Sequence, residues 1–131
     1  MRLTAVLIAT LISWTAFAEP GVFPWHINFG EVQIDQSAQR PIQITNNSRN
    51  RALSFSLQSN CREDFLIYAF TCQRPLPPQR SCEVFIEYIP RSFKTRQCWL
   101  QFNFVEIGKP SLTSVKRVPV RGRGVPLGPL Q

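Results

Sequence analysis

Short runs in which apolar and polar residues alternate recur along most of this chain. Residues 53–58, with the sequence LSFSLQ, are the clearest case. A period of two is typical of a strand with one buried and one solvated face. Each such strand needs a second layer to cover its apolar side. The same alternation occurs at residues 27–34, 42–44, 82–88, 98–104 and 115–120.

Turn-forming residues separate these runs. Residues 46–48 (NNS) and 108–111 (GKPS) predict turns. The prolines within residues 75–78 predict a loop, because proline has no N–H to donate to a ladder. Residues 65–70 are apolar at odd and even positions alike, so this segment lacks the regular alternation of the other runs. The whole pattern indicates an all-β, immunoglobulin-like two-sheet β-sandwich of seven to eight short strands, with a small β-barrel as the alternative.

The first eighteen residues have the pattern of a secretory signal peptide. Arg2 precedes an apolar stretch at residues 3–12, and residues 16–18 (AFA) provide a small-residue cleavage site. An uncleaved membrane anchor is disfavoured, because the apolar stretch is shorter than the roughly 20 residues that span a bilayer. We therefore expect an exported chain, periplasmic or extracellular, of 113 residues (131 − 18). Its formal charge is +6, since the whole chain carries +7 and loses Arg2.

All four cysteines follow the expected cleavage site, at Cys61, Cys72, Cys82 and Cys98. An oxidising compartment favours two disulfides, and four cysteines allow three pairings. A zinc site is disfavoured, because the sequence has no C-x-x-C pair and His26 is distant from the cysteines. We expect neither a metal nor a cofactor.

Groups suited to catalysis are scarce. His26 is the single histidine, and therefore the one side chain that titrates near neutral pH without perturbation. Glu63 with Asp64, or Glu83 with Glu87, would need a facing cleft to act as an acid and base pair. Solvated surface charge is the favoured role for Glu83 and Glu87. The sequence has no phosphate-binding glycine loop or nucleophile elbow, so we expect no enzymatic activity.

Basic residues are in excess, with 15 Lys and Arg against 8 Asp and Glu. Lys116, Arg117, Arg121 and Arg123 cluster near the C-terminus, and the odd-numbered arginines share one face of the predicted strand. Such a face would attract an anionic partner, or it would protect an exposed edge strand against self-pairing. A second basic group surrounds a turn and consists of Arg40, Arg49 and Arg51.

Several short motifs follow one another along the chain. They are residues 28–46 (NFGEVQIDQSAQRPIQITN), 70–72 (FTC), 76–77 (LP), 81–84 (SCEV), 88–90 (YIP) and 118–124 (VPVRGRG). Their order and spacing resemble those of bacterial ASH-type domains, also called abnormal-spindle-like or choice-of-anchor domains. The resemblance covers about residues 27–125 and implies an immunoglobulin-like sandwich. It also implies a Cys72–Cys82 disulfide, which leaves Cys61 and Cys98 as the second pair.

The expected organisation is a signal peptide at residues 1–18, one ASH-type domain at 19–125 and a flexible tail at 126–131. These features favour an exported, non-enzymatic binding or structural module that contacts a protein or an anionic component of the cell envelope. A periplasmic chaperone or assembly factor that acts by strand addition is the alternative. The candidate surfaces are residues 116–123 and the proline loop, which we define as residues 74–80.

Three other interpretations are disfavoured. Nucleic acid is not an expected partner, because no recognition helix or stacking motif accompanies the basic charge. A transmembrane segment is not expected, because the sequence has no second long apolar run. Residues 46–48 match an N-glycosylation sequon, but we favour an ordinary turn at the end of a strand.

Overall fold

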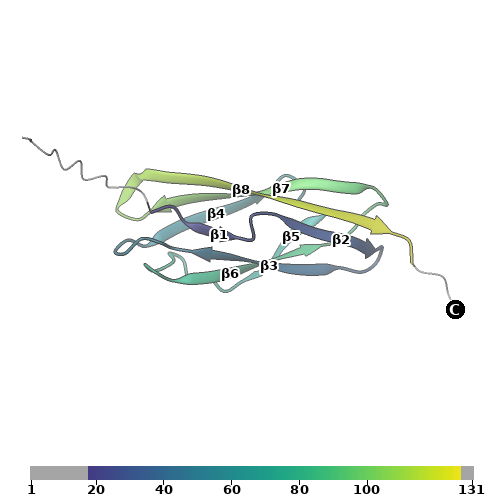
Figure 1. Cartoon of the computed structure of the whole chain (residues 1–131), viewed down its shortest axis with the longest axis horizontal. Helices are drawn as coiled ribbons and strands as arrows, with labels where there is room; N and C mark the ends of the chain where they lie inside the picture. The colour runs from purple at the N-terminus through teal and green to yellow at the C-terminus, as the bar shows by residue number, and fades with distance from the viewer. Residues whose placement is uncertain (1–17, 128–131) are drawn as a thin grey trace, which may run out of the picture.

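The computed structural model describes residues 18–127. The expected signal peptide lies outside this range apart from Ala18, and residues 128–131 of the expected tail also lie outside it. The described chain folds into eight strands (Figure 1). They are β1 (Gly21–Phe23), β2 (Ile27–Gln33), β3 (Ala38–Thr45), β4 (Leu53–Ser59), β5 (Phe65–Phe70), β6 (Ser81–Tyr88), β7 (Thr95–Glu106) and β8 (Lys109–Val125).

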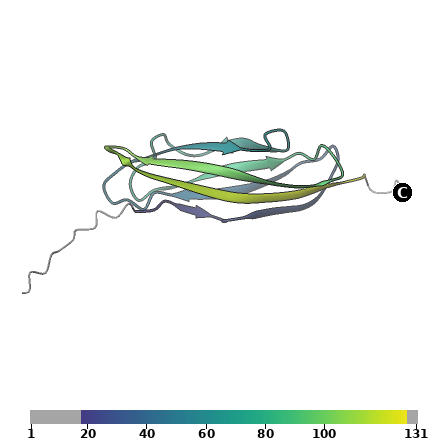
Figure 2. The ribbon, with the colours of Figure 1, turned by 90° about the horizontal axis from the view of Figure 1, so that it is seen from above.

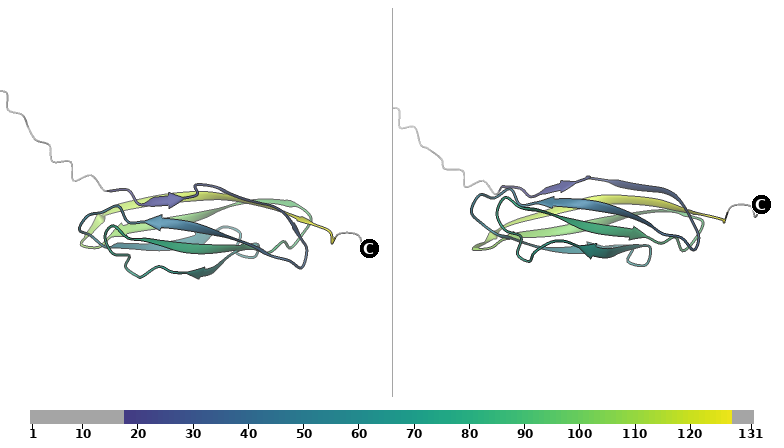
Figure 3. Two further views of the ribbon diagram at one scale, coloured as in Figure 1. Left: turned by 60° about the horizontal axis from the view of Figure 1, so that its bottom comes forward. Right: turned by 90° about the horizontal axis from the view of Figure 1, so that it is seen from below.

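These strands form two four-stranded sheets packed face to face. One sheet has the order β1-β3-β6-β5 and the other β2-β8-β7-β4. The right panel of Figure 3 shows the first sheet with β5 at its edge. Neighbouring strands are antiparallel except β2 and β8, which are parallel. The two-sheet sandwich prediction is therefore confirmed, and the barrel alternative is wrong because neither sheet closes.

The alternation read from the sequence places the core between the sheets. Every second residue from Cys82 to Tyr88 in β6 is buried, as is every second residue from Cys98 to Glu106 in β7. The rings of Phe29, Phe65 and Tyr88 lie 4.8–5.7 Å apart and join the two layers. Burying a large apolar side chain contributes about 1.5–3 kcal/mol, so this pattern is the main source of stability.

Two strands differ from the sequence prediction. The short strand β1 was not expected, and it pairs with β3 before the chain crosses at Pro24 to the other sheet as β2. Strand β8 begins at Lys109, within the segment predicted as a turn. Gly108 has a positive φ of 89°, so a tight turn suffices and the following residues are free to pair with β7.

The apolar run at residues 65–70 is the edge strand β5, which pairs with β6 alone. Phe65 is buried, whereas the other five residues are exposed. Tyr68 is 61% exposed and Phe70 is 49% exposed. The regular alternation is lost here because the side of the sandwich next to β5 is uncovered.

The long strand β8 pairs with β7 along most of its length but with β2 only from Val120 onward. Figure 2 looks onto this sheet, with β8 in yellow-green beside β7. Within residues 18–127, no strand lies along the outer edge of residues 109–119. This edge is therefore a second uncovered feature of the sandwich.

Two disulfides cross-link the fold. Cys72 and Cys82 join the segment after β5 to the start of β6, with Cα atoms 4.9 Å apart. Cys61 and Cys98 join the segment after β4 to β7, with Cα atoms 6.0 Å apart. The structure thus brings together the same pairs that the resemblance implies.

A candidate anion-binding face

The alternation within β8 sets the direction of its basic side chains. Every second residue from Val118 to Gly124 is buried. Arg117, Arg121 and Arg123 therefore point outward from the sheet β2-β8-β7-β4 and are exposed. We call the outer surface of this sheet, which carries these three residues, the arginine face.

Lys116 does not belong to this face. Its parity is opposite to that of the arginines, and its Nζ lies 2.7 Å from the Glu19 carboxylate. The four basic residues that the sequence groups together are thus divided by the structure. Three arginines share one surface, and the lysine forms an ion pair with the start of the described chain.

Strand β7 supports Arg117. The register places Trp99 opposite Pro119 and Gln101 opposite Arg117. The Arg117 guanidinium carbon lies 4.4 Å from the centroid of the Trp99 ring, and its Nε donates to Gln101 Oε1 at 2.9 Å. Gln101 Nε2 in turn donates to Asn103 Oδ1 at 3.0 Å. A cation–π contact and a hydrogen bond together restrict the rotamers of the arginine.

Trp99 and Gln101 were not among the candidate residues predicted from the sequence. Their signal was present, because they alternate with the apolar residues Cys98, Leu100 and Phe102 and so face outward with the opposite parity. Only the antiparallel register of β7 and β8 shows that they lie beside Arg117.

A shallow groove of about 600 Å³ crosses the arginine face between β2 and β7. The exposed Pro119 forms the apolar part of its floor, whereas the neighbouring Val120 is buried in the core. His26 lies at one end, where its ring stacks on Trp25 with centroids 4.2 Å apart. The polar and aromatic side chains that line the groove are His26, Asn28, Gln97, Trp99, Arg117 and Arg121.

The charge of this groove is uncompensated. In the described part of the chain the ion pairs are Arg51–Glu106, Arg96–Asp64 and Lys116–Glu19. None of them includes Arg117 or Arg121. Arg123 lies opposite Glu31 in the register of β8 and β2, so a carboxylate is close to that arginine. Arg117 and Arg121 are therefore the part of the face best suited to attract an anion.

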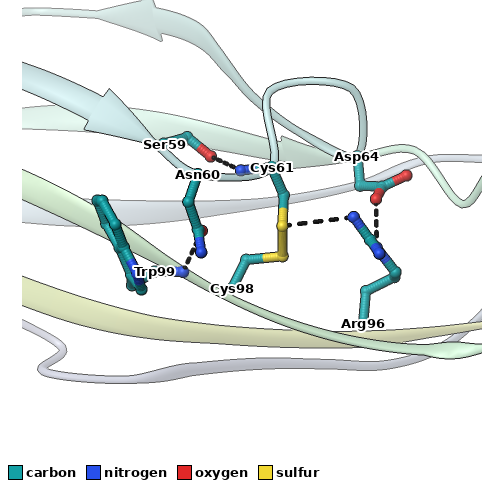
Figure 4. Close-up of a disulfide and its surroundings, with 7 residues drawn as sticks. All are labelled: Ser59, Asn60, Cys61, Asp64, Arg96, Cys98 and Trp99. Atoms are coloured by element: carbon teal, nitrogen blue, oxygen red, sulfur yellow. Dashed lines mark hydrogen bonds and ion pairs between the residues drawn. A yellow bond between two sulfur atoms is a disulfide. The ribbon is translucent and has the colours of Figure 1, made fainter.

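The Cys61–Cys98 disulfide joins the segment after β4 to β7 beside Trp99 (Figure 4). Cys98 precedes Trp99 and lines the groove. The backbone N–H of Trp99 donates to Asn60 Oδ1 at 2.8 Å. The residue before Cys61 and the residue after Cys98 are therefore also hydrogen-bonded to each other. The disulfide and this hydrogen bond together fix the backbone that carries Trp99.

An ion pair between the exposed Arg96 and the buried Asp64 completes this support. Asp64 is 4% exposed, and its Oδ2 accepts a hydrogen bond from Arg96 Nε at 2.6 Å. Arg96 also contacts the Cys61 sulfur at 3.5 Å. Figure 4 shows the arginine between the carboxylate and the disulfide. Asp64 is therefore structural, since a buried carboxylate needs such a partner.

The second basic group does not join the arginine face. Arg51 pairs with Glu106 at 3.3 Å, and Arg40 lies in the other sheet, 5.9 Å from the centroid of the Phe29 ring. Arg49 is exposed in the turn after β3. These three residues are dispersed and make no common site.

The proline loop is held firmly against the sandwich. Leu76 is buried and exchanges two backbone hydrogen bonds with Leu53. The Asn46 side chain donates to the carbonyl oxygens of Arg51, Leu76 and Pro77, at 2.9, 3.0 and 3.2 Å. Asn46 is 1% exposed, so the sequon has the role of a turn. The contacts of this loop are therefore those of a packed part of the sandwich.

The structure separates the groups considered for catalysis. No carboxylate among the described residues lines the groove beside His26. Glu83 and Glu87 share the outer parity of β6, in the other sheet. In residues 18–127 no three His, Cys, Asp or Glu side chains gather in a way that could hold a metal ion. The same residues include no helix long and apolar enough to cross a membrane.

Comparisons with known proteins show the fold. A scan against protein-family models finds no match, and a search of curated proteins finds none either. Among solved structures, an ASH/PapD-like domain of human CEP192 superposes with a TM-score of 0.68 at 13% identity. The match covers 85% of this chain and 88% of that domain. The chain thus has an ASH/PapD-like, immunoglobulin-like fold.

Two further structures share this fold over part of their length. The protease VesB of Vibrio cholerae has a TM-score of 0.59 at 14% identity, with 79% of this chain and 31% of that chain covered. The Escherichia coli chaperone DraB has a TM-score of 0.53 at 12% identity, with 85% and 58% covered. The chain therefore spans about a third of the protease and little more than half of the chaperone.

Proposed function

We propose that this chain is an exported, non-enzymatic binding module that holds an anionic partner on its arginine face. The observation that carries the proposal is the pair Arg117 and Arg121. Both guanidinium groups line the groove, and neither takes part in an ion pair within residues 18–127. Trp99 and Gln101 hold Arg117 in place before any ligand arrives.

The physical basis is charge attraction combined with preorganisation. A guanidinium group can bind a carboxylate, phosphate or sulfate through two parallel hydrogen bonds. Because Arg117 is already restrained, less side-chain entropy is lost when it binds. The positive charge of the chain also speeds the encounter with an anion, and this effect weakens as salt is added.

The partner class is a protein with an acidic surface or an anionic component of the cell envelope. Export is supported by the signal-peptide pattern of residues 1–18 and by the two disulfides, which persist in oxidising compartments. An exported chain would meet such surfaces directly.

The test is retention of the purified chain on immobilised polyanions as salt is raised. The double variant Arg117→Glu/Arg121→Glu should elute at much lower salt than the parent. Arg49→Glu/Arg80→Glu is the matched control, because it makes the same change of charge at exposed residues away from the face. Equal elution of the two variants would reject the arginine face as the site.

A second candidate function is assembly of a partner by strand addition. It is favoured by the uncovered edge of β8 at residues 109–119, where an extended segment could pair with free backbone groups. The fold shared with a chaperone is compatible with this role. Suppression of a client's aggregation by substoichiometric protein, lost after reduction of the disulfides, would support it. A lack of suppression by the oxidised protein would reject it.

A further inference from the structure

The uncharged side chains of the arginine face restrict the ligand further. Ser56 and Gln58 of β4 are exposed and lie opposite Asn103 and Gln101 of β7. Hydroxyl and amide groups thus continue from Arg117 across the sheet to its edge. Each of these groups can donate and accept hydrogen bonds, as a ligand rich in hydroxyl groups requires.

Acidic side chains are nearly missing from this part of the sheet. In β4, β7 and β8 the one acidic residue is Glu106, which is buried and paired with Arg51. The outer surface of these strands therefore offers cations, amides and hydroxyls. These three strands have no outward carboxylate to repel an anionic ligand. On β2 the exposed Glu31 lies beside Arg123, at the end of the face away from Arg117.

The large apolar side chains that are exposed lie mostly elsewhere. Four of them belong to β5, in the other sheet. Val115 and Trp25 are the exposed apolar residues near the groove and the β8 strand that forms it. Protein interfaces have a desolvated, aromatic or apolar centre, and membrane-binding surfaces insert apolar side chains. On the arginine face the exposed apolar surface is small, and in the groove it consists of Pro119 beside Trp99, with arginines and amides around it. The ring face of a sugar can contact such a surface while its acidic and hydroxyl groups bind the polar side chains.

The spacing of the arginines suits a linear ligand. Arg117 and Arg121 are four residues apart on one strand, so their Cα atoms are separated by about 13 Å. Pro119 lies between them and is paired with Trp99. An extended ligand could therefore place acidic groups at both arginines while an apolar ring face rests on Pro119.

From these features we infer that the arginine face binds an acidic polysaccharide. This inference rests on the proposed function and names the ligand class of the same site. The carboxylate or sulfate groups of the chain pair with Arg117 and Arg121. Its hydroxyl groups bind Gln97 in the groove and Gln58 and Ser56 beyond it.

The first experiment compares affinities of the full chain for defined probes by calorimetry at fixed salt. Polygalacturonate supplies carboxylates on a sugar chain, dextran sulfate supplies sulfates, and dextran is the neutral counterpart. Polyglutamate supplies carboxylates without hydroxyl groups, and phosphatidylglycerol vesicles supply an anionic lipid surface. We expect at least tenfold tighter binding to one or both acidic polysaccharides than to polyglutamate or vesicles, and none to dextran.

The second experiment removes hydrogen bonds without changing charge. Gln58→Leu/Gln97→Leu should weaken polysaccharide binding at least fivefold and leave polyglutamate binding unchanged. Gln39→Leu/Gln43→Leu is the matched control, because both residues are exposed on β3 of the other sheet. The control variant should bind the polysaccharide as the parent does.

The outcomes separate the inference from the proposed function. Equal affinity for polyglutamate and the polysaccharides, with no effect of Gln58→Leu/Gln97→Leu, would overturn the polysaccharide inference and leave an anion-binding module. Preference for vesicles would also overturn it and would identify a lipid partner. Failure to bind any of the anionic probes would reject both.

Discussion

The Tyr88 ring of β6 lies where a side chain at Gly122 of β8 would be. A Cβ atom built on Gly122 would overlap three atoms of that ring. The two residues belong to opposite sheets, so the glycine lets the layers approach at this end of the sandwich. A Cβ atom built on Gly124 would likewise overlap the Ser92 carbonyl oxygen. The glycines of the last strand are therefore packing residues.

Gly122→Ala should destabilise the fold by about 2–3 kcal/mol, because an overpacked core must shift its backbone or side chains. Urea unfolding would measure the change in the free energy of unfolding. Tyr88→Leu, which removes the ring, should lower the cost of Gly122→Ala when the two changes are combined. Simple additivity of the two costs would contradict this account.

Tyr88→Phe should be nearly neutral or slightly stabilising at neutral pH. The Tyr88 hydroxyl is buried and has no hydrogen-bond partner among the described residues, so the substitution removes an unsatisfied polar group. Thermal unfolding of the two proteins at pH 7 would measure the difference. A loss of more than about 1 kcal/mol would indicate a partner for the hydroxyl.

The same residue predicts an alkaline pH dependence. Burial raises the pKa of the Tyr88 hydroxyl above its ordinary value of 10.0; Asp64 adds to this rise, and Arg96 opposes it. Above pH 10 the unfolded chain loses this proton more readily than the folded chain does. The free energy of unfolding should therefore fall as the pH rises past 10, and less steeply in Tyr88→Phe. Denaturant titrations of both proteins across this range would test it, and identical slopes would contradict it.

Loss of either disulfide should lower the free energy of unfolding by about 2–4 kcal/mol. Only the loss of Cys61–Cys98 should also weaken polyanion binding. Cys61→Ser/Cys98→Ser frees the backbone that carries Trp99, so polyanion affinity should fall at least threefold. Cys72→Ser/Cys82→Ser is the control, because that pair lies in the other sheet. Affinity would be measured at a temperature where both variants remain folded. An equal loss of affinity in both would show that the effect is general.

Asn46→Ala should cost about 2 kcal/mol, because it removes the three hydrogen bonds from a buried amide that tie the turn after β3 to Arg51 and to the proline loop. It also leaves the buried Ser48 N–H without its Asn46 Oδ1 acceptor. Asn47→Ala is the neighbouring control. Asn47 is exposed and, within residues 18–127, its side chain donates one hydrogen bond, to the Glu19 carbonyl, so a change within about 0.5 kcal/mol is expected. Chemical denaturation of both variants would measure these costs, and similar values would contradict the role given to Asn46.

The fold was largely readable from the sequence. A period of two in residues 53–58, 82–88 and 98–104 reflects one buried face, so local pattern and tertiary burial agree there. The short strand β1 could not be predicted from the sequence, because three residues are too few to show a period of two. Its pairing with β3 also depends on the tertiary structure, since the residues between them, including Pro24, lead the chain into the other sheet first. Residues 65–70 do not alternate. They form the uncovered edge strand β5, in which Phe65 alone is buried, so the strand has no regular pattern of buried and exposed positions.

The site was readable only in part. The parity of β8 already places Arg117, Arg121 and Arg123 on one face. Trp99 and Gln101 could be seen to point outward, but their contact with Arg117 depends on the register of two strands. Lys116 was grouped with the arginines because charge was counted along the chain, whereas its partner Glu19 is 97 residues away.

The sequence by itself determined what depends on neighbouring residues: the strand periods, the turns and the outward direction of the arginines. Only the tertiary structure decided what depends on distant residues meeting. It placed Trp99 under Arg117, Glu19 beside Lys116 and the Tyr88 ring against Gly122. The physical reason is that side-chain direction follows from local backbone geometry, whereas the register and packing of two sheets are set by contacts across the whole core.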